Sequence, residues 1–154
     1  LSATYTAFLF AQAEGRDLWQ STLLPAHLFV QAIMAGAASL LIIAPFFNLT
    51  PDSFRILVWS FGTSVVINLL ITVGGEFGTP HASQVAAMAA HSITHGRYKK
   101  HYWFSLIGGC LAPLLTLGLT ASPLALAIAG VLSLVGLFFY EWAFVMAPQE
   151  VPNN

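Results

Sequence analysis

Residues 23–47 read LLPAHLFVQAIMAGAASLLIIAPFF, a long apolar run without a single Asp, Glu, Lys or Arg. A helix needs about 20 mostly apolar residues to cross the hydrocarbon core of a bilayer. This run is long enough, and its polar members are limited to His27, Gln31 and Ser39. The stretch therefore predicts a membrane-spanning helix, and we expect the chain to be organised around such spans.

The composition of the whole chain agrees with that expectation. Of its 154 residues, 57% are hydrophobic and 7% are charged, and the mean hydropathy is +0.77. Soluble domains carry about 25% charged residues, so this chain is expected to be an integral membrane protein. A net charge of −1 provides no basic face for nucleic acid, which is excluded as a partner. The single cysteine, Cys110, excludes an internal disulfide and a cysteine-ligated iron–sulfur cluster.

Three more apolar stretches complete the predicted fold. Together with the first, the expected spans are about 23–47, 54–73, 102–119 and 124–145. Residues 1–13 are apolar but too short to span alone, so they predict an N-terminal partial helix. The Ala-rich segment 80–95 ends just before Gly96 and predicts a short helix at the membrane surface. We thus expect an all-α, polytopic transmembrane bundle, a single domain over 1–154 that belongs to a longer subunit.

The basic residues predict the orientation of the bundle. Four of the five fall in segments on one side of the predicted membrane: Arg16, Arg97, Lys99 and Lys100. Only Arg55 falls on the other side. Because Lys and Arg are enriched in cytoplasmic loops, the segment 76–101 and the C-terminus are expected to lie in the cytoplasm.

A line of polar side chains runs along the second span. Ser60, Ser64 and Asn68 recur every four residues, and Thr72 continues the row toward Glu76. Such a line is expected to face protein or water rather than lipid. We therefore interpret it as a hydrogen-bonded file that leads to a relay carboxylate at Glu76.

Two carboxylates, Glu76 and Glu141, fall near membrane depth, and both lie toward the predicted cytoplasmic side. Ionisable groups at this depth usually line a polar path or pair with one another. The alternative is that each carboxylate reaches out to water at the interface. His27 begins the first span, where an interfacial position is expected. The candidates for a proton relay are Glu76, Asn68, Ser64, Ser60, Thr72, Glu141 and His27.

The segment 76–103 holds four of the five histidines. His91 and His95 are four residues apart and share a helix face, a spacing that some zinc sites use. No Glu lies between the two histidines, and Glu76 is the only acidic residue nearby, so a set of metal ligands is not complete. The pattern therefore favours a solvated or partner-facing helix end, and no metal site is predicted.

Three stretches resemble the NrfD/polysulfide-reductase family of membrane subunits. YTAFLF at 5–10, followed by LWQSTLLPAHLFVQAIMAGAASLL at 18–41, is similar to a family loop that leads into a helix rich in small residues. AAHSITHGRYKKHYWFSLIGGCLAPLL at 89–115 resembles the family's surface helix and the Gly- and Pro-containing span after it. LFFYEWAFVMAPQEVP at 137–152 resembles the last span and tail, although Ala147-Pro148-Gln149 departs from the family's (A/G)GQ pattern.

The resemblance implies the C-terminal bundle of a subunit made of two four-helix bundles in the bacterial inner membrane. Such subunits anchor an iron–sulfur protein beside other membrane subunits and lipids, and they exchange electrons with quinol in respiratory or photosynthetic complexes. Menaquinone or ubiquinone, iron–sulfur clusters and molybdopterin or haem c are expected in the wider complex. Because the family's quinone pocket lies mainly in the missing N-terminal bundle, this chain is expected to hold no catalytic or cofactor-binding residue. Members of the alternative complex III type are thought to move protons, which implies an accessory subunit with a proton half-channel.

Two other functions are compatible with a helix bundle. A haem-b anchor of a quinone-linked dehydrogenase needs two axial histidines at matching depth on different spans, but only His27 falls within a predicted span. Half of a secondary transporter would use discontinuous helices near the midplane. Gly108-Gly109 and Pro113 permit such a break, but no internal repeat accompanies them. The electron-transport subunit is therefore the favoured interpretation.

Overall fold

The computed structural model describes residues 2–13, 16–81 and 83–151. Within these residues every regular element is a helix. Four helices are long and apolar enough to cross a membrane: Leu24–Phe46, Pro51–Glu76, Lys99–Leu119 and Pro123–Glu150. The predicted all-α bundle of four spans is confirmed. Three of these spans extend beyond their predicted bounds, because polar residues near their ends remain helical.

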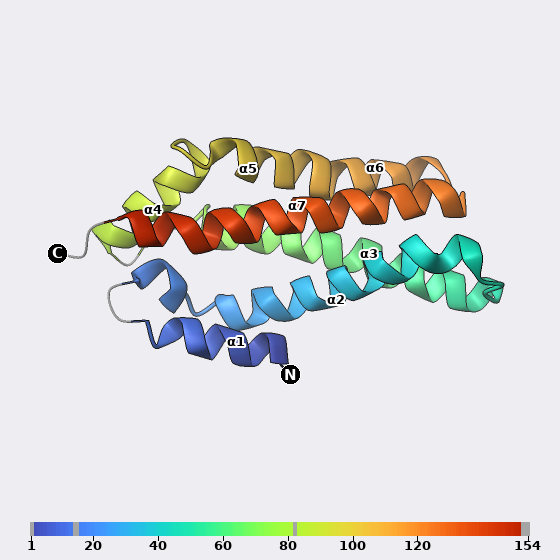
Figure 1. The fold of residues 1–154 in the computed structure, drawn as a ribbon, viewed down its shortest axis with the longest axis horizontal. Helices are drawn as coiled ribbons and strands as arrows, with labels where there is room; N and C mark the ends of the chain where they lie inside the picture. The colour runs from blue at the N-terminus through green and yellow to red at the C-terminus, as the bar shows by residue number, and fades with distance from the viewer. Residues whose placement is uncertain (1, 14–15, 82, 152–154) are drawn as a thin grey trace.

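Three of the four spans change helix type along their length, and Figure 1 shows all four running along the long axis of the molecule. The segments η3 and η4 are π-helical, a wide-turned form that often occurs at functional sites. In chain order the spans consist of α2 (Leu24–Ile43) with η2 (Ala44–Phe46), α3 (Pro51–Leu70) with η3 (Ile71–Glu76), α5 (Lys99–Phe104) with η4 (Ser105–Leu111) and α6 (Ala112–Leu119), and the continuous α7 (Pro123–Glu150).

Prolines and one hydroxyl mark where the spans begin. Pro25, Pro51 and Pro123 lie in the first turns of α2, α3 and α7, where a helix does not use the N–H that proline lacks. Before α3, the Thr50 hydroxyl accepts a hydrogen bond from the Ser53 N–H at 3.3 Å. This contact caps the helix and satisfies one of its unpaired backbone donors.

The shorter helices gather around one half of the bundle (Figure 1). α1 (Ser2–Ala11) packs against α2, and α4 (Gln84–Thr94) packs against α7 and the short turn η1 (Asp17–Gln20). The Ser83 hydroxyl caps α4 by accepting from the Ala86 N–H at 3.1 Å, so the helix begins later than the predicted 80–95. A side chain at Gly96 would lie 2.8 Å from the Ser92 Cα, which explains the glycine that follows this helix.

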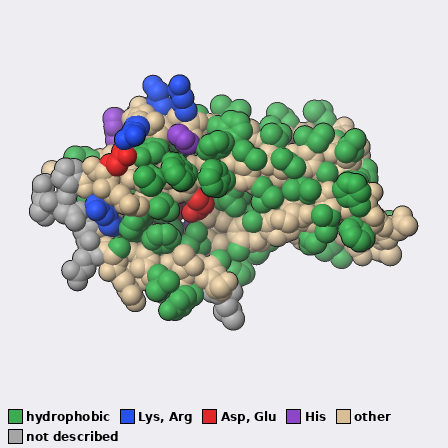
Figure 2. All heavy atoms as spheres, viewed as in Figure 1, with side chains coloured by type: hydrophobic (Ala, Val, Ile, Leu, Met, Phe, Trp, Pro, Cys, Tyr) green, Lys and Arg blue, Asp and Glu red, His purple; other side chains and the backbone are tan. Residues whose placement is uncertain are grey.

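Basic residues collect at the end of the bundle where α4 meets the end of α7, as the face in Figure 2 shows. Arg16 donates to the carbonyls of Pro148 and Val151 at 2.7 and 3.1 Å. Arg97 forms an ion pair of 2.9 Å with Glu150. These contacts place the segments that carry Arg16 and Arg97 at one end, as the sequence predicted, whereas the cytoplasmic location of this end remains a prediction.

Two apolar clusters form the core. One lies around the end of the bundle that carries η1 and α4 and includes Tyr102, Tyr140 and Phe144. The other fills the opposite half and includes Phe61 and Leu126. The polar side chains that are buried in the bundle come mainly from α2, α3 and η3, and they are His27, Gln31, Ser64, Asn68, Thr72, Glu76, Ser105 and Ser133.

Candidate functional site: a buried polar cluster

His27 is the centre of this cluster. It lies on the first turn of α2 and its residue surface is only 1% exposed. Its Nδ1 is 2.9 Å from Oε1 of Glu76, an ion-pair distance across two spans. The ring is therefore enclosed by the bundle and paired there with a carboxylate, whereas its interfacial depth in the membrane remains a prediction.

The second ring nitrogen of His27 meets three polar groups. Nε2 is 2.9 Å from Oδ1 of Asn68, 3.2 Å from Nε2 of Gln31 and 3.3 Å from Oγ1 of Thr72. A protonated Nε2 can donate to the Asn68 oxygen, and an unprotonated one can accept from the Gln31 amide or the Thr72 hydroxyl. The surroundings of His27 thus offer hydrogen-bond partners to both protonation states of the ring.

Glu76 is the last residue of η3, and it is 5% exposed. Its Oε2 accepts a hydrogen bond from the hydroxyl of Tyr140 on α7. The ring of Tyr140 also packs edge-on against His27, with 5.4 Å between ring centroids. The carboxylate is therefore held between α2 and α7, and it is enclosed rather than extended to water at the interface.

The polar file predicted on the second span divides in the structure. Asn68 and Thr72 contact His27, and the Asn68 amide also donates to the Cys110 sulfur at 3.6 Å. Ser64 is buried but donates to the carbonyl of Phe61 in its own helix, at 2.8 Å. Ser60 is exposed on the outer surface. Residues four apart in an α-helix advance by about 40° at each step, so Ser60 has rotated away from the face that Thr72 occupies.

Glu141 lies on α7 next to Tyr140 in the chain. Its Oε1 is buried and has no hydrogen-bond partner among the described residues. Glu141 is thus a second acidic group next to the same cluster, with one oxygen free to accept or carry a proton.

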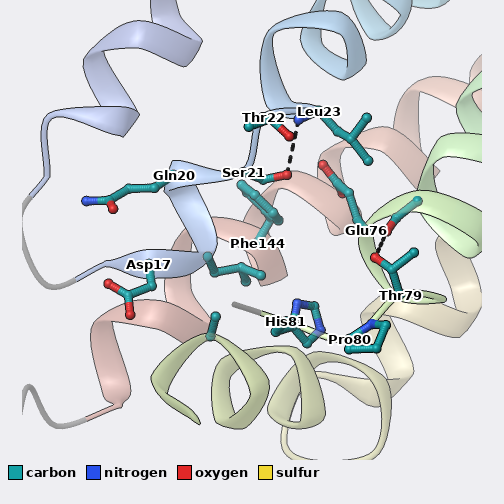
Figure 3. A pocket seen from close by; sticks show the side chains of 13 residues that line it. Asp17, Gln20, Ser21, Thr22, Leu23, Glu76, Thr79, Pro80, His81 and Phe144 are labelled. Atoms are coloured by element: carbon teal, nitrogen blue, oxygen red, sulfur yellow. Dashed lines mark hydrogen bonds between the residues drawn. The ribbon is translucent and has the colours of Figure 1, made fainter. Parts of the chain in front are cut away.

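A cavity of about 260 Å³ reaches Glu76 from the end of the bundle that carries η1 and α4 (Figure 3). Leu23, Pro80 and Phe144 contribute apolar surface to its wall. Its polar side chains come from η1, from the turn between η1 and α2, from the end of η3 and from the segment after it, and they are Asp17, Gln20, Ser21, Thr22, Glu76, Thr79 and His81. The cavity gives Glu76 a route toward water.

The other direction along the bundle is apolar. Beyond Asn68 the core is filled by side chains that are at most 1% exposed, namely Met34, Leu41, Phe61 and Leu126. A hydrated path for protons needs polar groups or room for water, and the buried hydroxyls in this part of the described core, Ser64 and Ser133, donate to the carbonyls of Phe61 and Gly109. The cluster therefore opens toward one end of the bundle.

Two members of the cluster were missed by the sequence analysis as site residues. Gln31 lies one turn after His27 on the same helix face, so the i,i+4 spacing was a usable signal. Tyr140 carries no such signal, because its contact with Glu76 depends on how α7 is rotated in the bundle. His91 and His95 stack on the exposed side of α4 with 5.4 Å between ring centroids. The described residues contain no group of three or more His, Cys, Asp or Glu that could hold a metal ion.

A family model described as "Polysulphide reductase, NrfD" matches residues 1–153 of the chain. No curated protein and no solved structure matches the chain.

Proposed function

Because the chain belongs to the NrfD (polysulphide reductase) family, whose members are membrane subunits of quinone-linked oxidoreductase complexes, we propose that its bundle serves such a complex as a one-sided proton half-channel. Glu76 is the carboxylate that receives the proton from the cavity. His27 receives it from Glu76, and Glu141, the second carboxylate on this side of the bundle, is the group that takes it next. In this role the chain is an accessory subunit, and it performs no redox chemistry of its own.

The observation that carries the proposal is the buried pair of His27 and Glu76, 2.9 Å apart. A lone charge inside the bundle would be strongly destabilised. Transfer of one proton from imidazolium to carboxylate converts the ion pair into two neutral groups, so neither state leaves an unpaired charge. The ring keeps its Nε2 proton in both states, and the Asn68 oxygen at 2.9 Å can accept a hydrogen bond from it. The proton can therefore lie on either His27 or Glu76, because the ion pair and the neutral pair differ little in free energy.

The shape of the bundle supports a half-channel rather than a complete channel. The cavity leads from one end to Glu76, and apolar side chains fill the described core beyond Asn68. A proton taken up from the cavity would have to leave sideways, and Glu141 has a buried oxygen without a partner for that purpose. We propose that the cavity end faces the bacterial cytoplasm, as the positions of the basic residues indicate.

The redox groups belong, in this proposal, to the rest of the complex. An iron–sulfur subunit, other membrane subunits and a second helix bundle would carry the clusters, the molybdopterin or haem c, and the site for menaquinone or ubiquinone. The residues of the cluster support this division, because they are engaged with each other: both ring nitrogens of His27 face side chains. That arrangement suits proton transfer better than axial ligation of a haem iron.

The test is Glu76→Gln in the complete complex, reconstituted in vesicles with quinol as reductant. We expect proton translocation per electron to be lost while electron transfer continues, because glutamine keeps the size of the side chain but cannot take up the proton. Glu150→Gln is the matched control, since Glu150 is a carboxylate at the bundle end that pairs with Arg97 outside the cluster. Unchanged coupling in Glu76→Gln would contradict the proposal.

A further inference from the structure

We propose that His81 collects protons at the mouth of the cavity and delivers them to Glu76. This inference rests on the half-channel proposed above and adds its entry group. From the sequence, the histidines of the segment 76–103 are expected on a solvated or partner-facing surface. The structure separates His81 from the others, because its side chain lines the same cavity as Glu76 (Figure 3).

The remaining histidines have other surroundings. His91 and His95 lie on the exposed side of α4 and stack on each other. His101 packs edge-on against Phe139, with 5.4 Å between ring centroids. His27 is enclosed in the cluster. Among the histidines of the described residues, His81 is therefore the one that lines the cavity with Glu76.

The cavity has the size and the polar groups to hold water between the two side chains. A water molecule occupies about 30 Å³ in the liquid, so a cavity of about 260 Å³ has room for several. The Thr79 hydroxyl donates to the carbonyl of Gly75 at 2.6 Å, which leaves its oxygen free to accept from water. Ser21 and Thr22 line the wall nearby. Water held by such groups can conduct a proton from His81 to Glu76.

The transfer balances in protons and charge. A proton from bulk water binds the free ring nitrogen of His81 and forms an imidazolium. The ring then releases the proton of its other nitrogen to a cavity water, and that water passes a proton to the carboxylate of Glu76. The ring returns to its neutral form, and Glu76 becomes a carboxylic acid. Imidazole suits this role because it exchanges protons with water near neutral pH.

The other titratable group in the lining of the cavity is Asp17 on η1. Arg16, next to it in the chain, donates to two carbonyls at the end of α7. The cavity thus combines one imidazole with two carboxylates, Asp17 and Glu76, around a space for water.

The experiment is His81→Ala in the complete complex in vesicles, with proton uptake measured during quinol turnover. Proton transfer by a positioned side chain typically contributes 10²–10⁴-fold, and water can replace part of it, so we expect uptake to slow about tenfold or more. Added imidazole should restore the rate, because the cavity is open and the small base can occupy the vacated space. His91→Ala is the matched control, and it should neither slow uptake nor respond to imidazole.

The outcomes separate this inference from the half-channel itself. Restoration of His81→Ala by imidazole would support it, whereas a purely structural defect would not respond. Normal uptake in His81→Ala, or slow uptake that imidazole does not restore, would overturn it. If Glu76→Gln abolishes coupling while His81→Ala behaves normally, the half-channel stands and the entry group lies elsewhere. Should the alanine variant fail to assemble, His81→Gln keeps a polar side chain of similar size that cannot carry the proton; slow uptake in this variant would support the inference, and normal uptake would overturn it.

Discussion

Tyr140→Phe should destabilise the bundle by removing one hydroxyl. The Tyr140 hydroxyl donates to Oε2 of the buried Glu76, and the phenyl ring keeps the packing against His27 and Phe144. A hydrogen bond to a charged group contributes about 1.5–3 kcal/mol, and loss of the donor leaves a buried oxygen unpaired. We therefore expect the free energy of unfolding to fall by about 1.5–3 kcal/mol, roughly a ten- to hundredfold change in the folded-to-unfolded ratio.

The assay is denaturant unfolding of the purified protein in detergent, followed by the loss of helical circular dichroism. Tyr102→Phe is the matched control. Tyr102 is buried like Tyr140, and both rings pack edge-on against Phe77. Among the described residues, however, the Tyr102 hydroxyl makes no hydrogen bond. The control should change stability by less than the test variant. Equal losses in the two variants, or an unchanged Tyr140→Phe, would refute the argument that this hydroxyl stabilises the Glu76 carboxylate.

Two further predictions concern the close helix crossing and the end of the bundle. A side chain at Gly109 would lie 2.8 Å from the Cα of Gly136, so Gly109→Ala should lower the free energy of unfolding by about 1–3 kcal/mol. Gly36 has open space around it, so Gly36→Ala should not lower it. Equal stabilities of the two variants in the unfolding assay would contradict this prediction. Burial, and then the hydrogen bond to Glu150, raise the pKa of Tyr98 above its ordinary value. The resulting stabilisation is present below the unfolded-state pKa of about 10 and is lost as pH rises through the higher folded-state pKa. The free energy of unfolding should therefore fall across this alkaline range in the unchanged protein and not in Tyr98→Phe. The same dependence of the unfolding free energy on pH in both proteins would contradict this prediction.

The spans were predictable because their signals are local. Hydropathy and length identify a stretch such as 23–47 without knowledge of its neighbours, and Pro51 and Pro123 mark where helices begin. The gathering of Arg16 and Arg97 at one end also followed from the order of spans and loops alone. What joins these segments, such as the bonds from Arg16 to the carbonyls near the end of α7, depends on packing that no local pattern encodes.

The candidate site was predictable only where its members share a helix. Asn68 and Thr72 follow from their spacing toward Glu76, because residues four apart lie on neighbouring turns. The same spacing misled at Ser60, since a drift of about 40° per step accumulates over a long α-helix. Tyr140 could not be predicted in this way. Its place beside Glu76 depends on how α7 is rotated against the second span.

The helix type of η3 explains how the second span brings its polar residues to one place. A π-helical turn contains more residues than an α-helical turn, so each residue advances the helix by a smaller angle. The bond from the Phe77 N–H to the Thr72 carbonyl, at 3.1 Å, is of this wider type. The smaller angle offsets the forward drift of α3, so Glu76 remains close to the face that carries Asn68 and Thr72.

Gly75, the residue before Glu76, allows η3 to lie close to the start of α2. A side chain at Gly75 would lie 2.7 Å from a methyl carbon of Leu23, so η3 approaches the start of α2 more closely than an alanine would allow without a shift of that leucine. Leu23 is one turn before His27. The close approach at Gly75 and the wide turn of η3 together place the Glu76 carboxylate 2.9 Å from the His27 ring. The proton-transfer pair proposed here therefore depends on backbone features of the second span as much as on the two side chains.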